Sequence, residues 1–158
     1  MSGLFGFSKK KKKRLSVDEI EKLPQGTMLV DCFDRVVGTP MKRGYDELVL
    51  YAHSEGRLLL ERYEDGGLDT EQKTAYLVPI SAAEDAYSAI GAAGMERWNE
   101  RHDTVAICGR SCVCKFRTPD GDYVRVSSDQ MPKDGTASFH KVRASLGSYL
   151  REEYLRRS

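Results

Sequence analysis

CVCKFRTPDGDYVRVS, residues 112–127, is the stretch that decides the fold. Apolar and polar residues alternate on both sides of TPDG, residues 118–121. Proline suits the first central position of a type I turn, and glycine suits the left-handed position that follows it. This turn sets a register that pairs Thr118 with Asp122, Phe116 with Val124 and Cys114 with Val126. The stretch is therefore predicted to be a β-hairpin.

The two faces of this hairpin differ in character. One face is apolar and is predicted to point into the core: Cys112, Cys114, Phe116, Val124 and Val126. The other is cationic and carries the candidate binding residues Lys115, Arg117, Tyr123 and Arg125. The simplest interpretation of this cationic face is a solvated surface without a partner. If it binds an anion or an acidic partner, the arginines supply forked donors and the tyrosine a stacking surface.

One more candidate precedes the hairpin. Trp98 follows a predicted helix and could join the cationic face. A tryptophan at a helix end more commonly closes the rim of the core.

Length and composition indicate one ordinary globular domain. The chain has 158 residues, 40% hydrophobic and 31% charged, enough to build a core without disulfides or metal. We assign residues 1–14 to a disordered basic arm and residues 15–158 to a single α+β domain. No export signal or membrane-spanning run is evident, so the four cysteines are expected to be reduced and the protein cytoplasmic.

The arm concentrates the positive charge in Lys9, Lys10, Lys11, Lys12, Lys13 and Arg14. Without these six, 19 basic residues face 24 acidic ones, a net charge of −5. A basic run beside Leu4, Phe5 and Phe7 is typical of a weak anchor at an anionic membrane, where each cation contributes about 1 kcal/mol. The alternatives are a solubilising terminus without a partner, or nucleic-acid binding, although no aromatic residues interleave the lysines.

The first half of the chain predicts a short helix and several strands. Ser16 and Glu19 form a capping box that starts the helix. Strands are predicted over residues 28–33, 47–53, 57–63 and 73–78, with a long loop over 34–46. The hairpin 47–63 is apolar on both faces, because Val49, Tyr51, Leu59 and Tyr63 lie opposite its leucines. Such a sheet is covered twice, by its own elements or by another chain, including a second copy.

Two longer helices complete the predicted architecture. Ser81 and Glu84 form a second capping box before a helix with a narrow stripe of small residues. The last helix is predicted from about residue 136 to the C-terminus, with Phe139, Val142 and Leu146 buried. The fold class is therefore α+β, an antiparallel sheet from at least two hairpins with two main helices on one face.

The cysteines carry the only candidate for catalysis. Cys108, Cys112 and Cys114 are spaced C-x3-C-x-C, which is not a zinc knuckle, and buried free thiols are the simplest interpretation. A cysteine-dependent enzyme would use Cys108 or Cys112 as an exposed thiolate. Hydrolase and zinc-protease motifs are missing from the sequence, and no cofactor or metal is predicted.

These patterns favour a non-catalytic cytosolic interaction or regulatory module. Its basic arm is predicted to contact an anionic surface such as a membrane, which would make the protein peripheral. The second hypothesis is a nucleic-acid-associated protein that uses the arm with the cationic face. The third is the cysteine-dependent enzyme, of unknown substrate.

Overall fold

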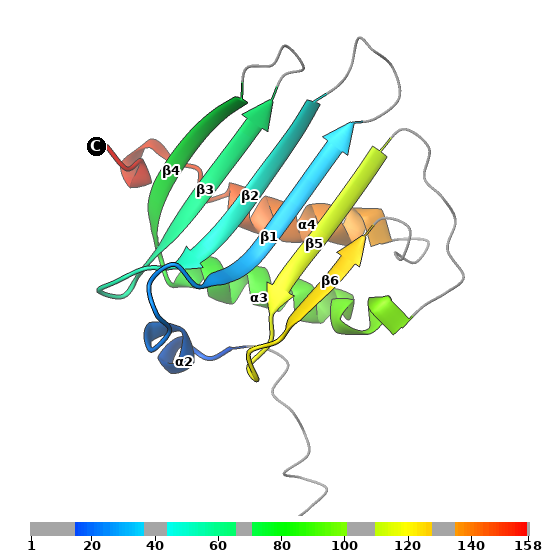
Figure 1. The fold of residues 1–158 in the computed structure, drawn as a ribbon, viewed down its shortest axis with the longest axis horizontal. Helices are drawn as coiled ribbons and strands as arrows, with labels where there is room; N and C mark the ends of the chain where they lie inside the picture. The colour runs from blue at the N-terminus through cyan, green and yellow to red at the C-terminus, as the bar shows by residue number, and fades with distance from the viewer. Residues whose placement is uncertain (1–14, 37–43, 66–70, 101–109, 128–134, 158) are drawn as a thin grey trace, which may run out of the picture.

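The computed structural model describes residues 15–36, 44–65, 71–100, 110–127 and 135–157 (Figure 1). The helical elements are α2 (Val17–Glu21), α3 (Ser81–Ala93), η1 (Met95–Glu100), α4 (Gly135–Gly147) and η3 (Glu152–Tyr154). The strands are β1 (Met28–Val36), β2 (Gly44–Ala52), β3 (Arg57–Asp65), β4 (Glu71–Pro79), β5 (Arg110–Arg117) and β6 (Tyr123–Ser127).

The strands form one antiparallel sheet of six, in the order β4-β3-β2-β1-β5-β6. Helices α3 and α4 pack against each other and lie behind the sheet as drawn in Figure 1. The predicted α+β class, with an antiparallel sheet of hairpins and two main helices, is confirmed.

The hairpin that decides the fold has the predicted register. Cys114 pairs with Val126 and Phe116 with Val124. The amide of Thr118 donates to the carbonyl of Asp122 at 2.8 Å, and Gly121 has φ +94°, a conformation that glycine adopts readily. Because strand side chains alternate, this register fixes which face of β5 and β6 looks inward.

The core lies between the sheet and the helix pair. Phe116, Phe139, Leu48 and Cys114 are fully buried there. Tyr87 of α3 is also buried, and its hydroxyl reaches the backbone of the sheet. Helix α2 begins with the predicted capping box of Ser16 and Glu19, and its Ile20 joins the same core.

The predicted loop over 34–46 is wrong at both ends. Strand β1 continues to Val36 and β2 already begins at Gly44, with Asp34 and Asp46 as cross-strand partners. The polar residues at this end of the hairpin do not interrupt the strands. Asp46 is tolerated in β2 because its ion pairs with Arg62 and Arg143 neutralise its charge inside the sheet. The middle of that loop, residues 37–43, lies outside the described residues.

The second capping box is also wrong. Helix α3 has Ile80 at its N-cap, without a side-chain cap, and Ser81 is its first residue. The Ser81 hydroxyl instead accepts a hydrogen bond from Tyr149 at 2.9 Å. The Ser81 hydroxyl oxygen, which the predicted capping box would have used, therefore forms a tertiary contact instead.

The last helix is shorter than predicted. It ends at Gly147, where the lack of a side chain weakens helix propensity, and the chain then turns into η3. Leu155 forms a β-bridge with Tyr76 of β4, and the Arg156 amide donates to the carbonyl of Ala75 at 2.8 Å. The apolar periodicity continues past Gly147 because Tyr149, Leu150 and Tyr154 pack on the core although α4 has ended.

The predicted basic arm at 1–14 lies outside the described residues. Within the described ranges, no helix is long and apolar enough to cross a membrane.

Candidate functional site: the open face of the sheet

We call the side of the sheet opposite α3 and α4 the open face, because none of the described helices lies over it (Figure 1). Every second residue of each strand points to this side. Phe33, Tyr51, Leu59 and Tyr63 lie there and are half-buried rather than covered. The expectation that the sheet is apolar on both sides is thus confirmed.

The four cationic-face candidates come together on the open face, over β5 and β6. Lys115 lies directly across from Arg125, and Arg117 across from Tyr123. Tyr123 is exposed, with the Lys115 Nζ atom 5.1 Å and the Arg117 Cζ atom 5.8 Å from its ring centre. Its hydroxyl donates to the carbonyl of Met28 at 2.9 Å, which orients the ring. We call Lys115, Arg117, Tyr123 and Arg125 the basic patch.

The other predicted site residues are not placed with the basic patch. Trp98 belongs to η1, which contacts β6 and α3, but its side chain lies outside the described residues. The arm residues Lys9 to Lys13 and Arg14 also lie outside them.

Next to the basic patch is a group of carboxyls that sequence reasoning did not select. Asp31 of β1, Glu47 of β2 and Glu61 of β3 all point to the open face, and we call them the acidic cluster. The signal in the sequence was the presence of acidic residues at alternate positions of otherwise apolar strands. Only the register of β1 with β2 and β3 shows that they are neighbours.

Asp31 is held in its protonated form. Burial, together with a hydrogen bond and the charge of Glu47, raises the pKa of Asp31 to about 8, and nearby Lys115 opposes the shift only in part. The Asp31 carboxyl therefore donates to Glu47 at neutral pH. Its Oδ1 atom is buried and has no hydrogen-bond partner among the described residues.

Glu61 is the centre of a second set of contacts. It is 9% exposed, accepts a hydrogen bond of 2.6 Å from the Tyr63 hydroxyl and forms an ion pair of 3.0 Å with Lys73. Burial and the neighbouring Glu61 raise the pKa of Tyr63 to about 12, and burial likewise raises that of Tyr51 to about 12. Both tyrosines thus stay neutral and act as hydrogen-bonding, apolar contact surface.

One row across the sheet shows how the charges are arranged. Along it the cross-strand partners follow one another in the order Glu61, Val49, Asp31, Lys115 and Arg125. Acidic groups therefore occupy β1 to β3 and basic groups β5 and β6, and the boundary runs between β1 and β5.

The described cysteines do not form a reactive site. Cys32, Cys112 and Cys114 form no disulfide and are almost fully buried. A hydrogen bond to Cys114 and burial raise the pKa of the Cys32 thiol, and the Cys112 thiol lies 3.5 Å from the Asp34 carboxylate. Buried thiols are not accessible to a substrate. Cys108 lies outside the described residues.

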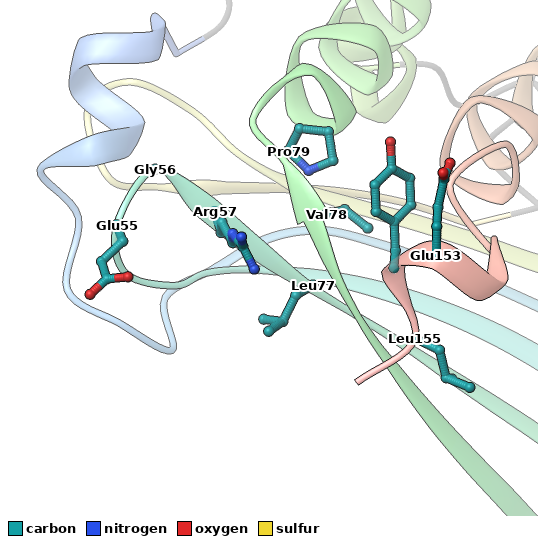
Figure 2. Close-up of a pocket in the computed structure, with 9 residues that line it drawn as sticks. Glu55, Gly56, Arg57, Leu77, Val78, Pro79, Glu153 and Leu155 are labelled. Carbon is teal, nitrogen blue, oxygen red and sulfur yellow. The ribbon is translucent and has the colours of Figure 1, made fainter. Parts of the chain in front are cut away.

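A groove of about 520 Å³ lies at the β4 edge of the sheet (Figure 2). The β2–β3 turn and the end of β4 form one wall, and the C-terminal segment with Tyr154 and Leu155 forms the other. Its charged side chains, Glu55, Arg57 and Glu153, come from the exposed rim. The groove brings together no cluster that could act on a bound molecule.

Comparison with known proteins adds no identity: no protein-family model matches the chain, and no curated protein matches it significantly.

Proposed function

We propose that the chain is a non-catalytic interaction module that binds a protein partner through the open face of its sheet. The open face supports this best, because it offers half-buried aromatic side chains together with charges of both signs. Aromatic residues and arginine are the side chains that dominate protein interfaces. The described cysteines form no disulfide, which suits a reducing compartment such as the cytosol.

We further propose that the basic arm attaches this module to an anionic membrane surface. The arm carries six positive charges in a row, whereas the remaining 144 residues have a net charge of −5. Attachment through the arm would leave the open face free for its partner.

Vesicle co-sedimentation tests this attachment. The full chain is expected to sediment with phosphatidylserine vesicles at low salt and not with phosphatidylcholine vesicles. A full-length variant with Lys9 to Lys13 and Arg14 replaced by glutamine should stay in the supernatant. Equal binding of the two proteins to the anionic vesicles would refute a role for the arm.

A nucleic-acid role is the second candidate, favoured by the basic patch with its exposed Tyr123. It is the weaker one, because the acidic cluster lies one strand away and repels phosphates. Binding to single-stranded RNA that weakens steeply with salt would support it, and a flat salt response would exclude it.

A further inference from the structure

We propose that the partner of the open face is a second copy of the chain, bound face to face so that the basic patch of each copy lies over Asp31 and Glu47 of the other. The inference rests on the proposed function and specifies its partner. The observation behind it is the division of charge between β1 and β5 on one sheet face.

The symmetry of such a pair follows from the row of charges. A two-fold axis that lies in the interface and runs along the strands reverses the order of the strands but keeps each row in place. With the axis between β1 and β5, Asp31 of one copy faces Lys115 of the other, and β2 faces β6. Glu47 then lies beside Arg125 of the second copy. Each contact occurs twice, as an isologous interface requires.

The same arrangement places a positive charge over Asp31. Its Oδ1 atom is buried and has no hydrogen-bond partner among the described residues. The charge of the lysine from the facing copy favours the ionised form of this carboxyl. The apolar residues around the row, such as Phe33 and Val113, would then be removed from water.

Other occupants match only half of the face. A basic segment, including the arm of this chain, is attracted to the acidic cluster but repelled by the basic patch. A nucleic acid is attracted to the basic patch and repelled by the acidic cluster. A surface that carries both signs in reversed order matches both halves, and the chain itself supplies that surface.

Pairing through the sheet edge is a less favourable route to assembly. Part of the outer edge of β4 is already bonded to the C-terminal segment at Ala75 and Tyr76. The other edge strand, β6, has only five residues. Short and covered edges are the usual protection against edge pairing, which leaves the face as the larger surface.

The size of the overlap predicts a moderate affinity. Four strands spaced ~4.8 Å and eight residues long at ~3.3 Å each span roughly 500 Å² of flat area. This lies at the small end of specific interfaces, so we expect a dimer with Kd in the micromolar range, on the order of 10 μM.

Sedimentation velocity of the full chain between about 1 and about 200 μM tests the proposal. The wild type should change from monomer to dimer over this range. Arg125→Glu and Glu47→Lys should each raise Kd at least about tenfold, because each places like charges together twice. Lys141→Glu, on an exposed position of α4, makes the same charge change away from the open face and should leave Kd unchanged.

The decisive experiment mixes the two variants. Arg125→Glu and Glu47→Lys, each mostly monomeric alone at about 50 μM, should form a mixed dimer, because each altered charge then meets its complement. Circular dichroism and melting show that both variants are folded. A monomeric wild type at about 200 μM, a monomeric mixture, or an equal effect of Lys141→Glu would each overturn the proposal. Vesicle binding through the arm is measured separately and would survive that outcome.

Discussion

The hydroxyl of Tyr87 in α3 lies 2.8 Å from the carbonyl oxygen of Arg117 in β5, and 3.2 Å from that of Leu29 in β1. The register of β1 with β2 shifts between Met28 and Val30, so Leu29 sits at a β-bulge. A bulge leaves a backbone group without its ladder partner. One buried tyrosine therefore joins the helix layer to two strands at the point where the sheet is irregular.

Replacement of Tyr87 by phenylalanine should lower the free energy of unfolding by about 1–3 kcal/mol, because two buried carbonyls lose a donor. Tyr149→Phe is the matched control, since its hydroxyl bonds Ser81 and Asp85 nearer the surface. Tyr149→Phe should lower the free energy of unfolding by less than Tyr87→Phe does. Urea denaturation of the two variants measures the difference, and equal losses would contradict the bridging role of Tyr87.

Asp46 makes the fold sensitive to acid. Burial alone would raise its pKa, but the hydrogen bonds and charges of Arg62 and Arg143 outweigh burial, so its pKa lies below the usual value. A carboxyl with a lowered folded-state pKa stabilises the fold above its unfolded pKa of about 4, and this stabilisation is lost as the pH falls through the folded pKa. Asp46→Asn should therefore reduce stability at pH 7 and flatten its decline below pH 4. Denaturant titrations from pH 2 to 7 check this, and parallel pH curves for both proteins would disprove it.

The pKa of Asp31 is shifted in the opposite direction from that of Asp46. Its folded-state pKa of about 8 exceeds the unfolded value, so the folded protein holds a proton that the unfolded chain releases. Below about pH 4 both states are protonated, and between pH 4 and about 8 this group makes the fold progressively less stable. Asp31→Asn keeps a donor toward Glu47 without this cost. The variant should gain stability relative to wild type as the pH rises to 8, and a difference that stays constant with pH would count against a protonated Asp31. Protein concentrations below the dimer range keep association out of this measurement.

The C-terminal segment is expected to protect the edge of β4. Arg156→Pro removes the amide that bonds Ala75, whereas Arg156→Ala keeps it and serves as the control. The proline variant should aggregate faster on warming, because an exposed strand edge recruits other chains. Light scattering at matched concentrations measures this. Identical aggregation of the two variants would show that the segment does not guard the edge.

The rate at which the thiols react with a labelling reagent distinguishes an interaction module from a cysteine-dependent enzyme. In a Cys108→Ser background, the remaining Cys32, Cys112 and Cys114 are buried, so a disulfide reagent should label them only as fast as the fold opens. Rapid labelling of one thiol in the native protein would revive the enzyme hypothesis.

Local chemistry predicted the hairpin at 112–127 because proline and glycine set the turn and the turn set every pair after it. The same reasoning placed Lys115, Arg117, Tyr123 and Arg125 on one face. Local chemistry gave the wrong element boundaries where contacts with residues distant in the sequence determine them. Strand β2 begins at Gly44 because Asp46 forms ion pairs with arginines on β3 and α4. Ser81 does not cap its helix because its hydroxyl forms a hydrogen bond with Tyr149.

The acidic cluster was missed for the same reason. Asp31, Glu47 and Glu61 are far apart in the sequence, and only the strand order brings them beside the basic patch. The sequence showed the charge of the arm, but the pattern of opposite charges on the open face required the register of five strands.

Hydroxyl-radical footprinting of the full chain at about 1 and about 200 μM tests the role of the open face most directly. Oxidation of Phe33, Tyr51 and Tyr123 should fall at the higher concentration, while oxidation of Tyr149, which packs beside α3, should stay constant. Unchanged oxidation of the three open-face residues, or equal protection of Tyr149, would contradict the assignment of this face as the surface where two copies meet.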